Sequence, residues 1–516
     1  MAALTLGSPL PSAAEGPGER GRPVEAPAAG GLRESDFRLI NQSGFGDGLN
    51  NYAHSMAFFE GRLYVGTTRG TWAMTKVNKP TPDLKPWPTE SPEDVYEVDR
   101  RAEIWRYEPE LDRWTRVFQA PYVKGRSKPV VPRYIGLRGM TVFQGPSDHK
   151  PCLYVSTWAP QQAEPPDVLR SEDGLSFTNA PRPPWDTSVR SFRTLQVFKG
   201  RVHTTPTGSN AGPGKSQECV ASEAAIYCTD DLQSARWVAA SSDGFGDDAN
   251  LTVFEMAQFN GHLYAGTVNA ERGFELWKTD GEGGPPYRWK RVLSHGAWRG
   301  PLNEVCGSLC AFKGALYVGT GIVNGGYHRA MRIGPGAPEL IRVWPDDSWE
   351  LLMGYSRLTP DGLKVPLSGY SGGFDNCFNG YVWRMGVHQD WLYAGTMSWA
   401  NVIPYLHTEV WPEEMLVLMR RWGKEEVVRR YGGCSLFRSR DGRVWEPVTR
   451  SGFGNKYNWG IRNFASTPHG LFVGTANPFG PTVAIRRDGR WVYVDNPRGG
   501  CEVWLGRSGQ SGVDRP

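Results

Sequence analysis

The chain has 516 residues, including 63 glycines and 21 tryptophans, and its formal net charge is +4. A charge this small gives no reason to expect a nucleic acid or a membrane surface as a partner. No apolar run approaches the roughly 20 residues needed to span a bilayer, and the eight cysteines form neither a CxxC pair nor a disulfide framework. Abundant Gly and Trp are typical of an all-β fold with tight turns and aromatic packing.

Residues 1–36 are rich in Pro, Ala and Gly, and we expect them to form a disordered N-terminal segment. They lack the basic start and long apolar core of a secretion signal, so we expect a cytoplasmic protein. A misassigned start that hides a processed leader is the alternative. Residues 508–516 are expected to form a flexible tail, which leaves 37–507 as a single β domain.

A repeated unit organises this domain, and it is clearest from Gly244 to Val292. In outline it reads GFGxxxN, then MxxFxG, then LYxGT, then ELW, and it ends with a Trp-x-x-Val after an acidic turn. Its short apolar pieces alternate with polar residues and are separated by Gly or Asp-Gly. This pattern predicts four short antiparallel strands joined by hairpins.

Seven such units can be counted by their second strand, although the third is degenerate. These strands are Leu63–Thr67, Leu153–Thr157, Arg201–Thr205, Leu263–Thr267, Leu316–Thr320, Leu392–Thr396 and Leu471–Thr475. The sequence therefore predicts an all-β, seven-bladed β-propeller, with six and eight blades as the alternatives.

The two ends of the domain are expected to meet in one sheet. Phe37–Ile40 matches the last strand of a unit but has no unit before it. We expect it to pair with the final sheet and close the ring, because closure removes free sheet edges. The third strand of that final sheet is either Thr482–Arg486 or Cys501–Leu505.

Two turns carry a family resemblance. They read SEDGLSF at Ser171–Phe177 and SRDGRVW at Ser439–Trp445. In these turns the chain resembles the Trp-rich propellers with Asp-box turns, such as sialidases. The resemblance implies architecture only, because the sialidase box is a hairpin remote from the active site and no Arg triad with a Tyr–Glu pair is evident here. A looser resemblance, to the propeller half of the bacterial alkylating enzymes that make cyclophanes, supplies no aligned catalytic residue.

Long insertions are predicted to gather on one face, whereas the turns of the opposite face are minimal. The insertions are Thr68–Arg101, Tyr122–Pro132, Trp158–Pro166, Pro206–Glu223, Gly354–Asp375 and Met397–Gly433. Because loops on a rigid scaffold carry function, this predicts a pocket at the central mouth. Decorative loops or an oligomer surface are the alternatives.

One insertion contains a predicted helix, Pro412–Tyr431. Its apolar stripe indicates either a helix packed on the propeller rim or a mobile cap over the pocket. The stripe consists of Met415, Leu416, Leu418, Met419 and Trp422.

The first strand of each unit is expected to line the axis, so its residues supply the candidate site. The repeated Asn at 50, 250, 303, 379 and 458 is interpreted as a structural turn residue. Arginines do not follow the repeat, and several that converge would bind an anion such as a carboxylate or phosphate, although each alone could be a rim salt bridge. The predicted substrate-binding arginines are Arg138, Arg193, Arg384 and Arg462.

Five tryptophans also depart from the repeat, and they either stack on a substrate ring or sugar or fill gaps under the insertions. They are Trp72, Trp158, Trp383, Trp399 and Trp459, and the last four are the predicted substrate-binding tryptophans.

His54 is the first candidate for acid–base catalysis, with Glu255, Tyr381 and Tyr134 as possible partners. Because His54 shares the alternation of Met56, the alternative is a structural histidine between blades. The nine histidines form no HxH or HxxxH pair, so we predict neither a metal nor a cofactor. Cys306 and Cys310 are expected on one strand face as packing residues.

These features predict an enzyme that acts on a small anionic, partly aromatic substrate by acid–base or electrophile activation. It would be a lyase, a hydrolase or a bond-forming biosynthetic enzyme. The alternatives are a glycan-binding lectin, for which several blades should carry equivalent sites, and a protein-interaction propeller. The oligomeric state is not predicted.

Overall fold

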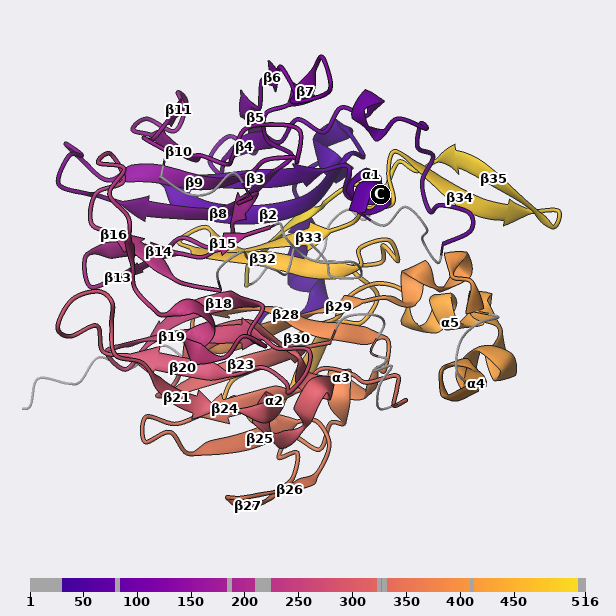
Figure 1. Cartoon of the computed structure of the whole chain (residues 1–516). Coiled ribbons are helices and arrows are strands. Elements are labelled where there is room, and N and C mark those ends of the chain that lie inside the picture. Colours follow the sequence, from indigo (N-terminus) through magenta and orange to yellow (C-terminus); the bar gives the residue numbers. More distant parts are fainter. Residues whose placement is uncertain are drawn as a thin grey trace, which may run out of the picture. The chain divides into compact units, whose positions relative to one another are not determined.

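Consecutive strands of the chain pair into four-stranded antiparallel sheets. The structure is a computed structural model, and it describes residues 30–78, 84–182, 188–208, 224–322, 326, 332–408 and 413–508. Seven such sheets follow one another in this part of the chain, and Figure 1 shows them in order from indigo to yellow. The first four sheets are β2 (Asn50–Phe59), β3 (Arg62–Arg69), β4 (Glu103–Glu108) and β5 (Arg113–Gln119); β8 (Gly136–Phe143), β9 (Cys152–Trp158), β10 (Val168–Ser171) and β11 (Thr178–Asn179); β13 (Gln196–Phe198), β14 (Arg201–Thr204), β16 (Tyr227–Thr229) and β17 (Val238–Ala239); and β18 (Thr252–Phe259), β19 (His262–Val268), β20 (Leu276–Thr279) and β21 (Lys290–Leu293).

The last three sheets repeat this arrangement, but the final one includes the N-terminal strand. They are β22 (Val305–Phe312), β23 (Ala315–Gly321), β24 (Leu340–Val343) and β25 (Trp349–Met353); β28 (Asn379–His388), β29 (Trp391–Ser398), β30 (Leu436–Ser439) and β31 (Glu446–Thr449); and β32 (Gly460–Thr467), β33 (Gly470–Ala476), β36 (Val503–Gly506) and β1 (Phe37–Leu39).

The N-terminal strand pairs with the final sheet, as the sequence predicted. Phe37 lies opposite Gly506, and Leu39 lies opposite Trp504. The third strand of this sheet is β36, which comes from the Cys501–Leu505 candidate, whereas β34 (Thr482–Arg487) and β35 (Arg490–Asp495) form a separate hairpin.

The expected disorder of residues 1–36 is wrong for the end of that segment. Leu32 is buried, and its backbone N–H donates to the Tyr393 hydroxyl at 2.9 Å. Arg438 donates to the carbonyl of Gly31. An apolar residue within the Pro- and Gly-rich segment therefore fills a site between the sixth and seventh sheets.

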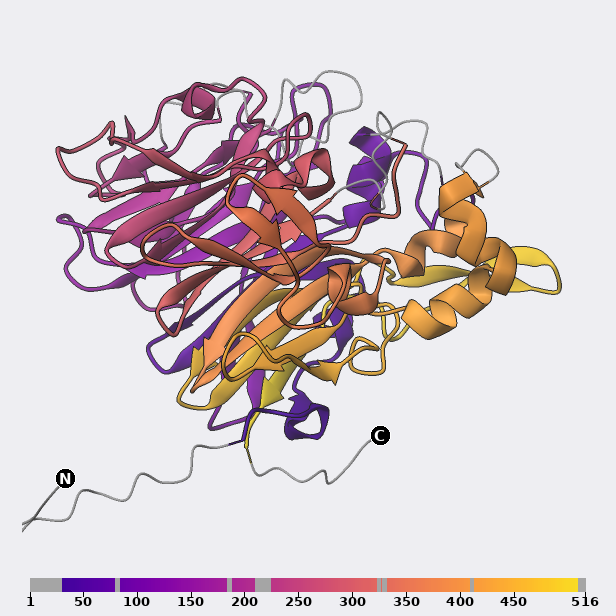
Figure 2. The ribbon, with the colours of Figure 1, turned by 90° about the horizontal axis from the view of Figure 1, so that it is seen from below.

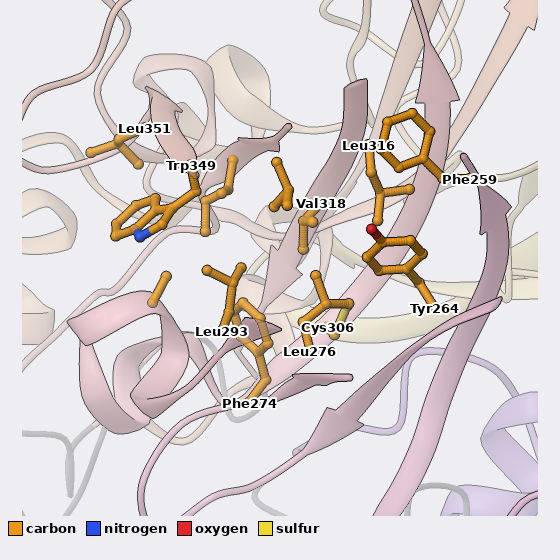
Figure 3. Close-up of a cluster of buried hydrophobic side chains, with 13 residues drawn as sticks. Phe259, Tyr264, Phe274, Leu276, Leu293, Cys306, Leu316, Val318, Trp349 and Leu351 are labelled. Carbon is orange, nitrogen blue, oxygen red and sulfur yellow. The ribbon is translucent and has the colours of Figure 1, made fainter. Parts of the chain in front are cut away.

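Neighbouring sheets pack through their first strands and through apolar clusters. The first strands contact one another in order, from β2 through β8, β13, β18, β22 and β28 to β32, which also contacts β2. The last sheet is linked to the first by the pair Tyr52 and Ala476. Figure 3 shows the buried cluster between the fourth and fifth sheets, where Tyr264 and Leu276 pack with Leu316 and Val318. The core is therefore all-β and propeller-like.

A hydrogen-bonded clasp holds the start of most first strands. In the fourth sheet, the Asn250 amide donates to the carbonyl of Gly244 at 2.9 Å and to the Glu275 carboxylate at 2.8 Å. The same carboxylate accepts from the Trp277 indole at 3.0 Å, and that indole stacks on Phe245 with centroids 4.9 Å apart. The amides of Asn50, Asn303, Asn379 and Asn458 donate to the corresponding glycine carbonyls. The structural interpretation of the repeated Asn is confirmed.

The clasp explains the repeated GFG. Gly244 and Phe245 both have positive φ, at 55° each, and this conformation is uncommon for a residue with a side chain. The tight turn that results presents the Gly244 carbonyl to Asn250 and lays the Phe245 ring on Trp277. Gly44 and Phe45 repeat this geometry in the first sheet.

Each well-formed first strand contains a β-bulge, which the sequence pattern did not predict. In β22 the register shifts between Cys306 and Ser308. Cys306 therefore packs between the fourth and fifth sheets, whereas Cys310 packs toward the sixth. The prediction that both cysteines share one strand face is wrong, because a bulge adds one residue and breaks the alternation.

Several insertions gather at one end of the sheets. Figures 1 and 2 both show α1 (Thr71–Asn78), the orange helices and the yellow β34–β35 hairpin together at the right-hand end. Trp72, Leu84, Tyr405 and Phe479 form one apolar cluster that joins these insertions. The hairpins β6–β7 (Tyr122–Val123 and Val131–Pro132) and β26–β27 (Arg357–Thr359 and Gly362–Lys364) lie instead at the top and bottom of Figure 1.

Most of the Pro206–Glu223 insertion lies outside the described residues. The remaining short elements are the pair β12–β15 (Ser191–Phe192 and Pro206–Thr207), α2 (His295–Trp298), α3 (Gly372–Asp375) and 3₁₀ turns at Glu34–Asp36, Ser43–Gly46, Val95–Glu97, Asp243–Gly246, Gly300–Asn303 and Ala400–Tyr405.

The predicted helix Pro412–Tyr431 is two helices, α4 (Glu413–Trp422) and α5 (Lys424–Tyr431). They are separated by Gly423, whose φ of 82° interrupts the helix. Leu416 and Met419 of the predicted apolar stripe are buried, and they pack with Val427 of α5. None of the helices in the described ranges is long and apolar enough to cross a membrane.

Replacing Asn250 by Ala tests the clasp. The change removes the two hydrogen bonds that the Asn250 amide donates, to the Gly244 carbonyl and to the buried Glu275 carboxylate. We expect the free energy of unfolding to fall by about 2 kcal/mol, because a typical intramolecular hydrogen bond contributes about 1 kcal/mol. Urea denaturation would measure it. Asn179→Ala, which removes an exposed amide that accepts one longer hydrogen bond, from the Tyr134 hydroxyl at 3.2 Å, is the matched control and should cost less than half as much. Equal losses would contradict the clasp.

Candidate functional site

Six of the seven first strands place one bulged residue toward a common central cluster, and in the third sheet the equivalent residue comes before β13 and lies in no bulge. The register shifts around His54 in β2, around Arg138 in β8 and around Arg462 in β32. Each bulged residue comes four positions after the repeated Asn or its equivalent. In chain order the seven residues at this position, which we call the ring residues, are His54, Arg138, Arg193, Phe254, Gly307, Trp383 and Arg462.

The structure brings the four predicted arginines together. Arg384, one position beyond its ring residue, forms an ion pair with Glu255, which occupies the same position in the fourth sheet. The Arg193 Nε donates to the carbonyl of Phe254 at 2.8 Å, and its guanidinium lies over the Phe254 ring. Arg138 donates to the hydroxyls of Ser191 and Thr207.

Arg462 has the least satisfied guanidinium of the four. Its side chain is 5% exposed, and it makes no hydrogen bond or ion pair with any residue that the structure describes. Its contact is with the face of Trp383, with the guanidinium carbon 5.0 Å from the ring centroid. Burial lowers the pKa of Arg462 well below its ordinary value, and the charges of Arg384, Arg193 and Arg138 lower it further. A buried cation without hydrogen-bond acceptors is costly, and a bound anion would offset that cost.

His54 lies within the same cluster. It is buried, and its Nδ1 lies 2.6 Å from the hydroxyl oxygen of Thr68. Burial lowers the pKa of His54 well below 6.5, and the nearby arginines, with Arg462 foremost, lower it further. The imidazole is therefore neutral at pH 7. Its Nε2 makes no hydrogen bond with the described residues, so it can act as a proton acceptor or donor toward a ligand.

The packing of His54 overturns its predicted alternation with Met56. Ala53 and Met56 share the apolar cluster between the seventh and first sheets, while the bulge turns His54 out of that face. Asn463 donates to the carbonyl of His54 at 3.0 Å, which fixes the bulged backbone. His54 is therefore placed among charged groups and not between apolar faces.

Aromatic rings surround the cluster. Tyr52 lies between His54, Trp383 and Trp459, with ring centroids 5.7, 5.9 and 6.2 Å away. Trp158 lies edge-on to His54, and the Arg138 guanidinium lies over it at 4.9 Å. Three of the four predicted tryptophans, at 158, 383 and 459, thus join the site region.

The fourth, Trp399, packs against Phe378 with centroids 5.0 Å apart, in the apolar cluster under α4 and α5. Of the two tyrosines predicted as partners of His54, one lies in the site region and the other does not. Tyr381 stacks on Phe254 and contacts Trp383. Tyr134 instead donates to Asp167 at 2.5 Å, and Arg133 pairs with the same carboxylate.

Sequence reasoning missed Tyr52, Thr68 and Phe254, and it missed the role of α1. Helix α1 contacts two tryptophans of the site, because Trp72 packs against Trp459 and Met74 packs with Trp158. Counting four positions from each repeated Asn would have found Phe254. Trp72 departs from the repeat, but no local signal places it or Met74 at the site, because their place depends on how the insertion folds back.

The described residues contain no group of His, Cys, Asp and Glu side chains that could hold a metal ion. The arrangement offers guanidinium groups, one neutral imidazole and aromatic faces. These groups can bind and orient an anion and transfer a proton to or from it.

No protein-family model and no curated protein matches the chain. Among solved structures, it is similar to the GH74 xyloglucanase from Xanthomonas campestris, with 12% identity over 92% of this chain and 56% of that one and a TM-score of 0.43. A puromycin-hydrolysing peptidase of Mycobacterium tuberculosis has 12% identity, coverage of 87% and 62%, and a TM-score of 0.38. An α-L-arabinanase of Penicillium chrysogenum has 12% identity, coverage of 70% and 93%, and a TM-score of 0.35.

The chain thus spans little more than half the length of the xyloglucanase and under two thirds of the peptidase. At this level of identity the similarity concerns the fold alone. It assigns no substrate and no reaction to the central cluster.

The neutral state of His54 predicts a pH effect on stability. Because the folded protein lowers the pKa of His54, the unfolded chain takes up this proton first as the pH falls. The contribution to stability is full above about pH 6.5 and is lost as the pH falls toward the lower folded pKa. Lowering the pH from about 7.5 to about 5.5 should therefore reduce the stability of the wild type more than that of His54→Gln, and thermal unfolding at the two pH values would measure the difference.

His203, whose pKa burial lowers to about 4, and His388 contribute equally to both proteins and cancel in this difference. Parallel losses of stability in the wild type and in His54→Gln would show that His54 is not held neutral.

Proposed function

We propose that the seven sheets are the blades of a closed seven-bladed propeller and that a pocket at its central mouth takes a small anionic, partly aromatic substrate. The cyclic contacts of the first strands and the link between the last and first sheets support the closed arrangement. The resemblance to sialidases remains limited to two hairpin turns.

The observation that carries this proposal is the state of Arg462. An arginine keeps its charge in proteins, and this one is buried with no acceptor among the described residues. Three further arginines lie close enough to oppose its charge, while the carboxylate of Glu255 supports it. A bound carboxylate or phosphate would supply the missing acceptors, and planar guanidinium groups suit such oxygens.

The aromatic groups support a substrate that carries a ring. Tyr52, Trp383 and Trp459 lie next to one another, and the last two come from different sheets. Aromatic faces of this kind bind rings by stacking, and an arginine already lies over Trp383. The anionic group and the ring of one small molecule would then be recognised side by side.

His54 is the proposed acid–base residue. Its Nε2 is not engaged by a described residue, and Thr68 fixes the other ring nitrogen. Glu255 is engaged by Arg384, so we assign it the positioning of that arginine rather than proton transfer. Tyr381 is proposed to line the same pocket. The reaction would be lyase, hydrolase or bond-forming chemistry.

The sheet-to-sheet variation of the ring residues favours one site over several. A lectin with a site in each blade would repeat its ligand contacts, but the ring residues are His, three Arg, Phe, Gly and Trp. The clasp, by contrast, repeats the same Asn in five of the seven sheets. The central positions therefore serve one asymmetric molecule.

A thermal-shift screen tests the proposal. Benzoate, glucuronate and phenol would be added to the wild type and to Arg462→Met. We expect benzoate to raise the unfolding temperature of the wild type most, because it combines a carboxylate with a ring, and we expect the shift to vanish in Arg462→Met. Arg113→Met, which replaces an exposed arginine of β5, is the matched control and should respond like the wild type.

A different result would change the assignment. Stabilisation by neutral sugars that Arg462→Met leaves intact would favour the glycan-binding alternative. No response to any of the three compounds, with all proteins folded, would remove the central anion site and leave a protein-interaction propeller.

A further inference from the structure

The unsatisfied groups around the central cluster are mostly hydrogen-bond donors. Arg462 has no acceptor among the described residues, and the Nε of Arg384 also lacks one, although its other end is paired with Glu255. The indole N–H groups of Trp72 and Trp459 are buried without an acceptor, and their rings lie 5.6 Å apart. Such a surface fits a ligand with several acceptor oxygens, since buried donors without partners are costly.

The aromatic contact of Arg462 leaves its edge available. Its guanidinium lies over Trp383 and is therefore held by its face, whereas Arg138, which lies over Trp158, already donates to the hydroxyls of Ser191 and Thr207. The N–H groups of a guanidinium lie in its plane, and they form pairs of parallel hydrogen bonds with neighbouring oxygens. The stacked guanidinium of Arg462 is therefore preorganised to hold an oxygen-rich group at its edge.

The charge at this position favours more than one negative charge on the ligand. At Arg462 the charges of Arg384, Arg193 and Arg138 all act against the cation, and the charge of Glu255 acts for it. Glu255 is itself engaged by Arg384. A single negative charge would offset one of these arginines and leave the repulsion among the others.

We infer that the anionic group bound by Arg462 and its neighbouring arginines is a dianion with clustered oxygens, either a phosphate monoester or two adjacent carboxylates on a ring. This inference rests on the proposed function and specifies its substrate class. A monocarboxylate such as benzoate would then be a partial ligand that occupies the ring-binding part and one pair of donors.

Two pairs of matched probes test the charge. Phenyl phosphate and phenyl sulfate share a ring and a tetrahedral head, but at about pH 8 the phosphate carries two charges because its second pKa is about 6. Phthalate and benzoate differ in the same way for carboxylates. Isothermal titration calorimetry at constant ionic strength would measure all four with the wild type, Arg462→Met, Glu255→Gln and the Arg113→Met control.

We expect at least one dianion to bind the wild type about tenfold more tightly than its monoanionic partner, a modest gain for one more charge among buried guanidinium groups. The pair of probes that shows this difference in affinity identifies the ligand as a phosphate ester or a dicarboxylate. Arg462→Met should reduce the difference in affinity between dianion and monoanion. Glu255→Gln should increase it, because the variant removes the carboxylate that competes for the arginines. Arg113→Met should reproduce the wild-type values.

Two outcomes would overturn the inference, and they are distinguishable. If monoanions and dianions bind the wild type equally and Arg462→Met weakens both, the anion site stands but the dianion does not. If none of the four probes binds to the folded wild type, the proposed function fails together with this inference.

Discussion

A buried amide–carboxylate contact fixes the geometry on which the central cluster depends. In the first sheet, the Asn50 amide bridges the carbonyl of Gly44 and the Glu103 carboxylate, which lies on the third strand. One side chain thus joins the entry turn, the start of the first strand and the third strand. Glu103 is 2% exposed and also accepts from Arg116, so its charge is compensated inside the fold. The ring residue comes four positions after Asn50. The hydrogen bonds that hold the start of the first strand therefore also set the direction in which the ring residue points.

The same backbone arrangement therefore recurs from sheet to sheet, while the ring residue differs. The clasp recurs at Asn250, Asn303 and Asn458, each with a carboxylate partner. Four positions on from these residues the chain carries Phe, Gly and Arg. Satisfied hydrogen bonds at the clasp provide the stability that permits unsatisfied donors at the ring. A buried cluster of like charges needs such support, because the repulsion between the charges favours unfolding.

Strand pattern and turn chemistry predicted the sheets, since each LYxGT segment forms a second strand and Phe37–Leu39 joins the final sheet. The four arginines were predicted because they break the repeat. The bulges were not predictable from alternation, since one added residue exchanges the two faces, as it does for His54 and for Cys306. The break at Gly423 and the place of Trp399 were also missed. Both depend on how an insertion packs rather than on its own pattern.

In the proposed site, the electrostatics of the cluster would connect anion binding to proton transfer. His54 is neutral because it is buried and because the four arginines surround it. An anion that enters the cluster offsets that positive potential, so it raises the pKa of His54 at the moment the ligand is bound. Because linkage is reciprocal, a protonated His54 would in turn hold the anion more tightly. An imidazole that is a base in the empty site and a stronger base in the occupied one is suited to take a proton from the molecule that the arginines hold. The arginines would then serve both to bind the substrate and to set when His54 accepts its proton.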